Sequence, residues 1–258
     1  LVMERQCQLV VDWMRVGFIH GVMNTDNTAI SGETIDYGPC AFMDHYSPKV
    51  VFSSIDKLGR YSFANQAPII KWNLSRFAEC LIPLIDKNED TAIKIATEII
   101  DNFEKIYEVK WLNMMRDKLG LFGEDTNDRE LINNLLSWME NNKADYTNTF
   151  CYLMNIKVND SEIYDDKSFI NWLDVWKKRS LMNNGSKEKQ LDIMLNVNPS
   201  VIPRNHKVEE ALTSANDDDL KVMNKLLSVL DKPYGDQKDI EEYQSPSDNK
   251  EYQTFCGT

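Results

Sequence analysis

Residues 20–27 are His20-Gly21-Val22-Met23-Asn24-Thr25-Asp26-Asn27, and residues 35–38 are Ile35-Asp36-Tyr37-Gly38. These two polar segments lie where a helical spacing of apolar residues breaks off. Val10, Met14 and Phe18 precede them at positions i, i+4 and i+8, on one face of a helix. The spacing predicts a helix that ends near Gly17 to Gly21, and the polar segments then form loops at its end.

The residues between the two segments favour a hairpin. Ala29-Ile30 and Thr34-Ile35-Asp36 flank Gly32, and we expect them to form two very short β segments around a turn. Nine positions separate Asn27 from Asp36. A hairpin of this size would return Asp36 to the neighbourhood of Asn27.

The two segments contain the residue types of a kinase-like phosphoryl-transfer site. Such a site uses a loop Asn and an Asp of the D-F-G type to hold Mg²⁺ against nucleotide phosphates. Asn27 and Asp36 are therefore the candidate metal ligands, for Mg²⁺ or Mn²⁺, and Asp36 is also the candidate contact to bound ATP through that metal. In the kinase pattern the catalytic Asp precedes the Asn by five residues, where this chain has Val22. Asp26 is the only carboxylate in the 20–27 loop, so it is the candidate catalytic base.

Each segment also has a structural interpretation. An N-x-D-N loop is commonly an Asx-rich turn, and D-Y-G is a common turn tripeptide. His20 is expected to hold the loop by hydrogen bonding rather than to act as a base. The order and spacing of the two segments together favour the catalytic interpretation.

Downstream of residue 61 the pattern is helical almost throughout, so the predicted fold is mainly α. Five stripes of apolar residues at helical spacing are expected to form the core. They are Ile70/Leu74/Phe77/Leu81, Ile93/Ala96/Ile100/Phe103, Leu131/Leu135/Trp138/Met139, Phe169/Trp172/Leu173/Trp176 and Leu220/Met223/Leu227/Leu230. Asn127 and Glu130 have the spacing of a capping box before the third. From Lys232 to Thr258 the chain is polar and is expected to lie on the surface or to be disordered.

Composition excludes several classes of partner. The 258 residues carry 29 Lys and Arg against 41 Asp and Glu, a net charge of −12, which argues against nucleic acid as a partner. No apolar run approaches the roughly 20 residues of a membrane helix, so a membrane is not expected as a partner either. The five cysteines are widely spaced and contain no C-x-x-C, which suggests neither a disulfide framework nor a zinc site.

Longer motifs in the chain resemble those of the selenoprotein O family, also called the YdiU family. The resemblance rests on residues 20–27 and 32–39, Gly59-Arg60-Tyr61-Ser62-Phe63-x-Asn65-Gln66, Trp72-Asn73-Leu74, Asn198-Pro199 and Pro203-Arg204-Asn205-His206. It implies a protein-kinase-like fold and an enzyme that transfers AMP from ATP to Ser, Thr or Tyr hydroxyls of proteins. It also implies that Asp26 accepts the proton and that Asn27 and Asp36 bind the metal.

By the same resemblance, residues 1–231 would be the C-terminal helical lobe of a kinase-like fold with a helical extension, and residues 232–258 a polar tail that ends in a cysteine. The family's Gly-rich loop, Lys, Glu and phosphate-binding arginines belong to an N-terminal lobe, and the chain, which starts at Leu1, contains no G-x-G. We therefore expect a fragment that is inactive on its own. The resemblance to bacterial members implies a cytoplasmic protein. Bacterial members can pair a cysteine near the C-terminus with one in the loop before the Gly59–Gln66 motif, but that loop here, Val50 to Asp56, contains no cysteine, and Cys40 is the nearest alternative partner for Cys256.

Two other functions remain open at this stage. An ordinary kinase-like phosphotransferase would use the same metal site, because the nucleotide orientation depends mainly on the other lobe. A catalytically silent helical interaction module would retain the motif without binding nucleotide. Intact Asp26, Asn27 and Asp36 argue against the silent module.

Overall fold

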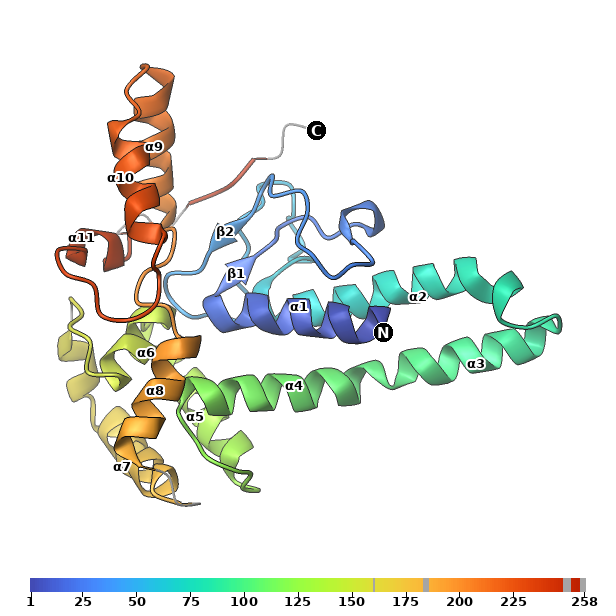
Figure 1. The fold of residues 1–258 in the computed structure, drawn as a ribbon, viewed down its shortest axis with the longest axis horizontal. Coiled ribbons are helices and arrows are strands. Elements are labelled where there is room, and N and C mark those ends of the chain that lie inside the picture. The colour runs from blue at the N-terminus through green and yellow to red at the C-terminus, as the bar shows by residue number, and fades with distance from the viewer. Residues whose placement is uncertain (160, 183–185, 248–251, 256–258) are drawn as a thin grey trace.

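The structure is a computed structural model that describes residues 1–159, 161–182, 186–247 and 252–255. It is mainly helical, as predicted (Figure 1). Its helices and strands are α1 (Val2–Val16), β1 (Phe18–Ile19), β2 (Ala41–Phe42), α2 (Gln66–Ile85), α3 (Glu89–Asp101), α4 (Phe103–Lys118), α5 (Asp128–Asn142), α6 (Tyr146–Leu153), α7 (Lys167–Ser180), α8 (Lys187–Val197), α9 (Asn205–Asn216), α10 (Lys221–Leu230) and α11 (Glu241–Gln244). None of the described helices is both long and apolar enough to cross a membrane.

Helix α1 lies at the centre of the main core and ends where the sequence predicts. Its C-cap is Gly17, whose φ of 73° is left-handed and whose N–H bonds back to the carbonyl of Met14. The helix buries one apolar face, which includes Val10 and Met14, against α2 and α4. The 20–27 loop, which contains the candidate catalytic residue, therefore follows shortly after a well-packed helix.

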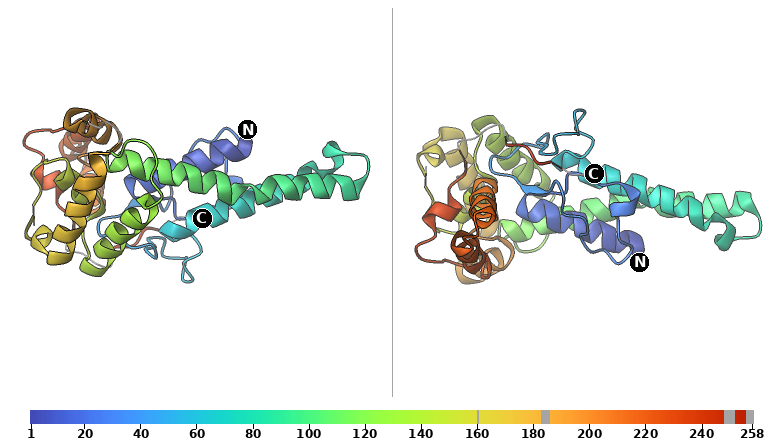
Figure 2. Two further views of the ribbon diagram at one scale, coloured as in Figure 1. Left: turned by 90° about the horizontal axis from the view of Figure 1, so that it is seen from below. Right: turned by 90° about the horizontal axis from the view of Figure 1, so that it is seen from above.

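Helices α2 and α3 extend beyond the core as a two-helix arm, which is visible in all three ribbon views (Figures 1 and 2). The arm explains why some predicted core residues are not buried. Ile93 of α3 is 46% exposed, whereas Ala96 on the same stripe is buried. The prediction that whole stripes form core is also wrong for α10, where Leu226 and Val229 are buried and Leu227 is exposed.

The predicted hairpin within residues 29–36 is wrong. The two strands instead flank the loops: β1 pairs antiparallel with β2, with Phe18 opposite Phe42. Residues 29–32 form a turn in which the Gly32 N–H donates to the Ala29 carbonyl. Side chains from elsewhere bond to residues 34 and 35, as described below, so this segment takes part in no strand ladder.

Two further predictions need correction. Asn127 is the N-cap residue of α5, but its side chain makes no capping bond. The polar segment after Lys232 is partly packed, since Ile240 and Tyr243 are buried in a small second core with residues of α9 and α10. Cys256 lies outside the described residues, so its predicted pairing cannot be followed in the structure.

Candidate functional site

Two buried amide side chains of α2 support the 20–27 loop. Gln66 is fully buried; its Oε1 accepts from the His20 backbone N–H at 3.0 Å, and its Nε2 donates to the Phe18 carbonyl at 3.0 Å. Asn73 donates from Nδ2 to the Met23 carbonyl at 3.0 Å. Because these amides satisfy backbone groups that leave regular structure, the loop has a defined conformation without strands of its own.

Helix α1 holds the connecting segment in a similar way. The Trp13 indole N–H donates to Thr34 Oγ1 at 2.8 Å, and Gln6 Nε2 donates to the Ala29 carbonyl. Both donors are buried side chains of α1. The segment between the two polar motifs is therefore fixed to the same helix that precedes them.

His20 joins the two motifs directly. It is fully buried, and its Nε2 lies 2.8 Å from the Ile35 carbonyl, next to Asp36. A carbonyl can only accept, so Nε2 carries the proton. Burial lowers the pKa of His20, which favours the neutral ring. The prediction that His20 holds the loop by hydrogen bonding is confirmed.

The side chain of Asn27 has a defined orientation. Its Nδ2 donates to the Val22 carbonyl at 3.1 Å, within the short 3₁₀ turn Thr25–Asn27 and the residues before it. With the amide nitrogen engaged in this way, the amide oxygen faces away from that carbonyl. An amide oxygen is the kind of hard ligand that Mg²⁺ prefers.

Val22 and Asp26 lie in opposite environments. Val22, at the position of the usual kinase aspartate, is 9% exposed. Asp26 is exposed on the 3₁₀ turn. A carboxylate at position 22 would lose solvation, whereas one at position 26 is accessible from solvent.

Asp36 stands in an unusual backbone conformation. Its φ of 56° lies in the left-handed region, and its side chain is exposed. Gly21, at the start of the loop, has a φ of 86°, and a Cβ there would lie 2.6 Å from the Pro39 carbonyl oxygen. The backbone therefore approaches so closely that only glycine fits at position 21.

By their chemistry, Asn27 and Asp36 would suit a phosphate-bound Mg²⁺ or Mn²⁺ rather than a metal held by protein alone. No group of three or more His, Cys, Asp or Glu residues that could hold a metal is present in the described part of the chain. Asn27 and Asp36 offer one amide and one carboxylate. Such a pair is sufficient only where nucleotide phosphates and water complete the octahedron.

Sequence reasoning singled out the loop but not the residues that support it. Gln66 and Asn73 are polar residues seven positions apart on the buried face of α2. Tyr61 donates from its hydroxyl to Asn24 Oδ1 at 2.7 Å, and Arg60 lies over the Trp72 ring at 5.0 Å. All of these except Asn24 lie in the Gly59–Gln66 and Trp72–Leu74 motifs, so the motifs themselves were the signal.

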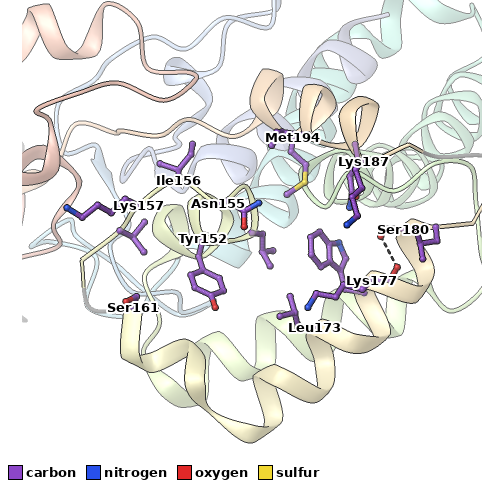
Figure 3. Close-up of a pocket in the computed structure, with 16 residues that line it drawn as sticks. Tyr152, Asn155, Ile156, Lys157, Ser161, Leu173, Lys177, Ser180, Lys187 and Met194 are labelled. Atoms are coloured by element: carbon purple, nitrogen blue, oxygen red, sulfur yellow. Dashed lines mark hydrogen bonds between the residues drawn. The ribbon is translucent and has the colours of Figure 1, made fainter.

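A separate cavity lies elsewhere in the molecule. It measures about 860 Å³ and opens between α6, α7 and α8, with Lys157, Lys177 and Lys187 among its lining residues (Figure 3). None of the predicted site residues lines it. Its size alone does not make it the reaction site, because the chemistry expected of this chain lies at residues 20–38.

Comparison with known proteins gives a consistent result. The family model described as "Protein adenylyltransferase SelO" matches residues 1–231. Similar curated proteins are each named "Protein nucleotidyltransferase YdiU". They include those of Pelagibacter ubique (61% identical over 260 residues), Nitrosococcus oceani (50% over 260 residues) and Clostridium perfringens (49% over 259 residues). Each alignment covers 100% of this chain but only 53–54% of the relative, so the chain spans about half the length of these proteins.

Proposed function

Because the chain belongs to the SelO family of protein adenylyltransferases, we propose that the full-length protein transfers AMP from ATP to Ser, Thr or Tyr hydroxyls of other proteins. The observation that carries the proposal is the hydrogen bond from His20 to the Ile35 carbonyl, which joins the loop of Asp26 and Asn27 to the segment of Asp36. ATP and hydroxyl-bearing proteins are the proposed partners.

The fold proposal follows from the same relationship. Residues 1–231 are proposed to form the helical C-terminal lobe of a kinase-like fold with a helical extension, and residues 232–258 its polar C-terminal tail. The mainly helical structure and the match of the family model over residues 1–231 support this division. Bacterial relatives and the need for ATP support a cytoplasmic location.

In the proposed reaction, Asp26 accepts the proton of the attacking hydroxyl, which its exposure allows. Asn27 and Asp36 would hold Mg²⁺ or Mn²⁺, and the bound metal would neutralise charge on the nucleotide phosphates. The acceptor oxygen bonds to the α-phosphorus of ATP, and pyrophosphate leaves. His20, Gln66 and Asn73 keep the loops in place, so that little reorganisation is needed during the reaction.

The second candidate is a kinase-like phosphotransferase. Asp26, Asn27 and Asp36 would also suit a kinase. A metal held beside the phosphates and a carboxylate that orients the hydroxyl would act in the same way whether the α- or the γ-phosphorus is attacked. The buried Val22, where a kinase would have its aspartate, favours the adenylyltransferase.

Labelled ATP distinguishes the two candidates. Full-length protein is incubated with an acceptor protein mixture and ATP labelled at either the α- or the γ-phosphate. We expect α-label on protein and a mass gain equal to AMP. Transfer of γ-label alone would replace the adenylyltransferase with a kinase. Transfer of neither label, while a full-length relative is active under the same conditions, would refute both and leave the silent module.

A further inference from the structure

The cavity between α6, α7 and α8 combines positive charge with an apolar surface. Its volume of about 860 Å³ is within the range of small-molecule sites. Of its 16 described lining residues, three are lysines (Lys157, Lys177 and Lys187) and none is Asp or Glu. The whole chain has the opposite balance, with 41 acidic residues against 29 basic ones. Because a hollow lined by charges of one sign attracts counter-ions, this cavity favours an anionic ligand.

Two of the three lysines are available to bind that ligand. Lys177 of α7 and Lys187 of α8 are exposed, and neither makes an ion pair with another described residue. Figure 3 shows both side chains extending into the space between these two helices, whereas Lys157 points away from them. Lys157 also lies 4.0 Å from Glu241. Lys177 and Lys187 are therefore the candidate partners of the anion.

The rest of the cavity is mainly apolar. Seven of the described lining residues are Leu, Ile, Val or Met, and Tyr152 and Trp176 add aromatic surface. The Trp176 indole N–H donates to the Leu119 carbonyl at 2.9 Å, so the polar atom of that ring is already paired. Leu181 is 66% exposed and Leu191 37% exposed. Exposed apolar side chains in a hollow are stabilised when a ligand covers them, so the ligand should carry an apolar chain.

The uncharged polar side chains of the cavity are partly engaged within the protein. Ser180 Oγ donates to the Lys177 carbonyl at 2.9 Å, and Gln190 Nε2 donates to the Leu119 carbonyl at 3.5 Å. Few uncharged polar groups are then left to bond to a sugar or a nucleobase. An aliphatic ligand suits the cavity better than a nucleotide.

We propose that this cavity binds a small amphipathic anion, a medium-chain alkyl carboxylate. Its carboxylate bonds to the amines of Lys177 and Lys187, and its alkyl chain packs against apolar lining residues such as Leu173 and Trp176. The proposal goes beyond the adenylyltransferase reaction and does not depend on it, because none of residues 20–38 lines the cavity.

Three small probes test the two parts of the ligand on the full-length protein. Octanoate has the charge and the chain, octanamide has the chain without the charge, and butyrate has the charge with a shorter chain. Binding is followed by NMR at the methyl group of Met194, which lines the cavity, after labelling of the methionine methyl groups.

We expect octanoate to shift the Met194 signal and to bind at least about tenfold more tightly than butyrate, because its longer chain buries more apolar surface. It should also bind at least about fivefold more tightly than octanamide, because two lysines face its carboxylate. Equal affinities within either comparison, or shifts confined to other methionines, would overturn the proposal.

A matched pair of double variants tests the lysines. Lys177→Gln/Lys187→Gln removes the two cavity amines, and Lys178→Gln/Lys189→Gln removes two exposed amines of the same helices that do not line the cavity. Both change the net charge equally. The first should lose the preference for octanoate over octanamide, and the second should keep it. Equal losses would show a general attraction of charge and would refute the site.

Two further probes separate the alkyl carboxylate from other anions. Vesicles that contain phosphatidylglycerol should not bind through Lys177 and Lys187, and AMP should bind more weakly than octanoate. Vesicle binding that requires both lysines, in the absence of octanoate binding, would assign them to a membrane surface and overturn the proposal. Tighter binding of AMP at the Met194 signal would make the cavity a nucleotide site and would overturn it equally.

Discussion

At the scale of single residues, Asp26 and Asp36 should have separable roles. Asp36→Ala in the full-length protein removes a proposed metal ligand, and we expect weaker binding of Mg-ATP by calorimetry. Asp26→Ala should leave that binding largely intact and lower turnover by about 10²-fold or more, the usual range for a lost general base. Glu33→Gln, an exposed carboxylate in the same segment, is the control and should change neither. Unchanged Mg-ATP binding in Asp36→Ala would refute the metal assignment.

Lys118 has a buried amine without a carboxylate partner among the described contacts. It is 1% exposed, donates to the Arg15 carbonyl at 2.7 Å and lies 3.8 Å from the centroid of the Phe150 ring. Burial, and then the nearby charge of Arg15, lower its pKa well below the usual value of 10.5. At a pH between the lowered pKa of Lys118 in the folded chain and its usual pKa in the unfolded chain, the unfolded chain binds a proton that the folded chain has released. Lys118 therefore makes the free energy of unfolding rise with pH.

The variant Lys118→Met tests this dependence. It keeps an unbranched apolar stem and removes the charge, so the free energy of unfolding should be equal to or higher than that of the unchanged chain at neutral pH. The difference in the free energy of unfolding between Lys118→Met and the unchanged chain should shrink as the pH approaches about 10. Urea denaturation of both chains over this range gives the difference, in which the titration of other groups cancels. A gap that stays constant with pH would show that Lys118 has an ordinary pKa.

At the scale of elements, Arg204 connects parts of the chain that are far apart in sequence. It is 1% exposed, and its guanidinium bonds to Asp44 and Asp145 at 2.6 Å each and to the Gln244 carbonyl at 2.6 Å. Asp145 is in turn the N-cap of α6. Arg204 therefore holds together the loop after β2, the start of α6 and the end of α11.

Arg204→Met should lower the free energy of unfolding by about 3–5 kcal/mol, because it leaves the buried carboxylate of Asp145 and the half-buried carboxylate of Asp44 without their ion partner. The double variant Arg204→Met/Asp145→Asn should recover part of that loss, since one of those carboxylates becomes neutral. Lys94→Met, which breaks an exposed pair with Glu98, is the control and should cost no more than about 1 kcal/mol. Urea denaturation curves for the three variants provide the comparison. Equal effects of Arg204→Met and Lys94→Met would contradict the bracing role.

The elements also show what the sequence could and could not predict. The end of α1 at Gly17 was predictable, because an apolar spacing and a glycine are local signals. The missing hairpin was not, because Trp13 and His20, both distant in sequence, bond to residues 34 and 35. Burial along α3 was not predictable either, since helical spacing identifies an apolar face but not whether another element covers it.

At the scale of the whole molecule, one large core extends from α1 to α8, and a small second core joins α9, α10 and the segment around Ile240. Helices α1 and α2, whose side chains support the candidate site, both belong to the large core. The site loops are thus attached to the most extensively packed part of the chain. This arrangement predicts that the 258 residues fold without the rest of the protein.

The final prediction separates folding from activity. The chain spans about half of its relatives and contains no G-x-G and no G-x-x-x-x-G-K, the glycine patterns whose backbone N–H groups hold nucleotide phosphates. We expect the 258-residue chain to show a cooperative thermal transition and no transfer of label from α-labelled ATP, with full-length protein as the positive control. Strong transfer by the chain alone would mean that its own residues bind the nucleotide phosphates, and the site would have to be reassigned. A non-cooperative transition would instead show that the large core depends on the rest of the protein, because tightly packed cores of this kind normally unfold as a unit.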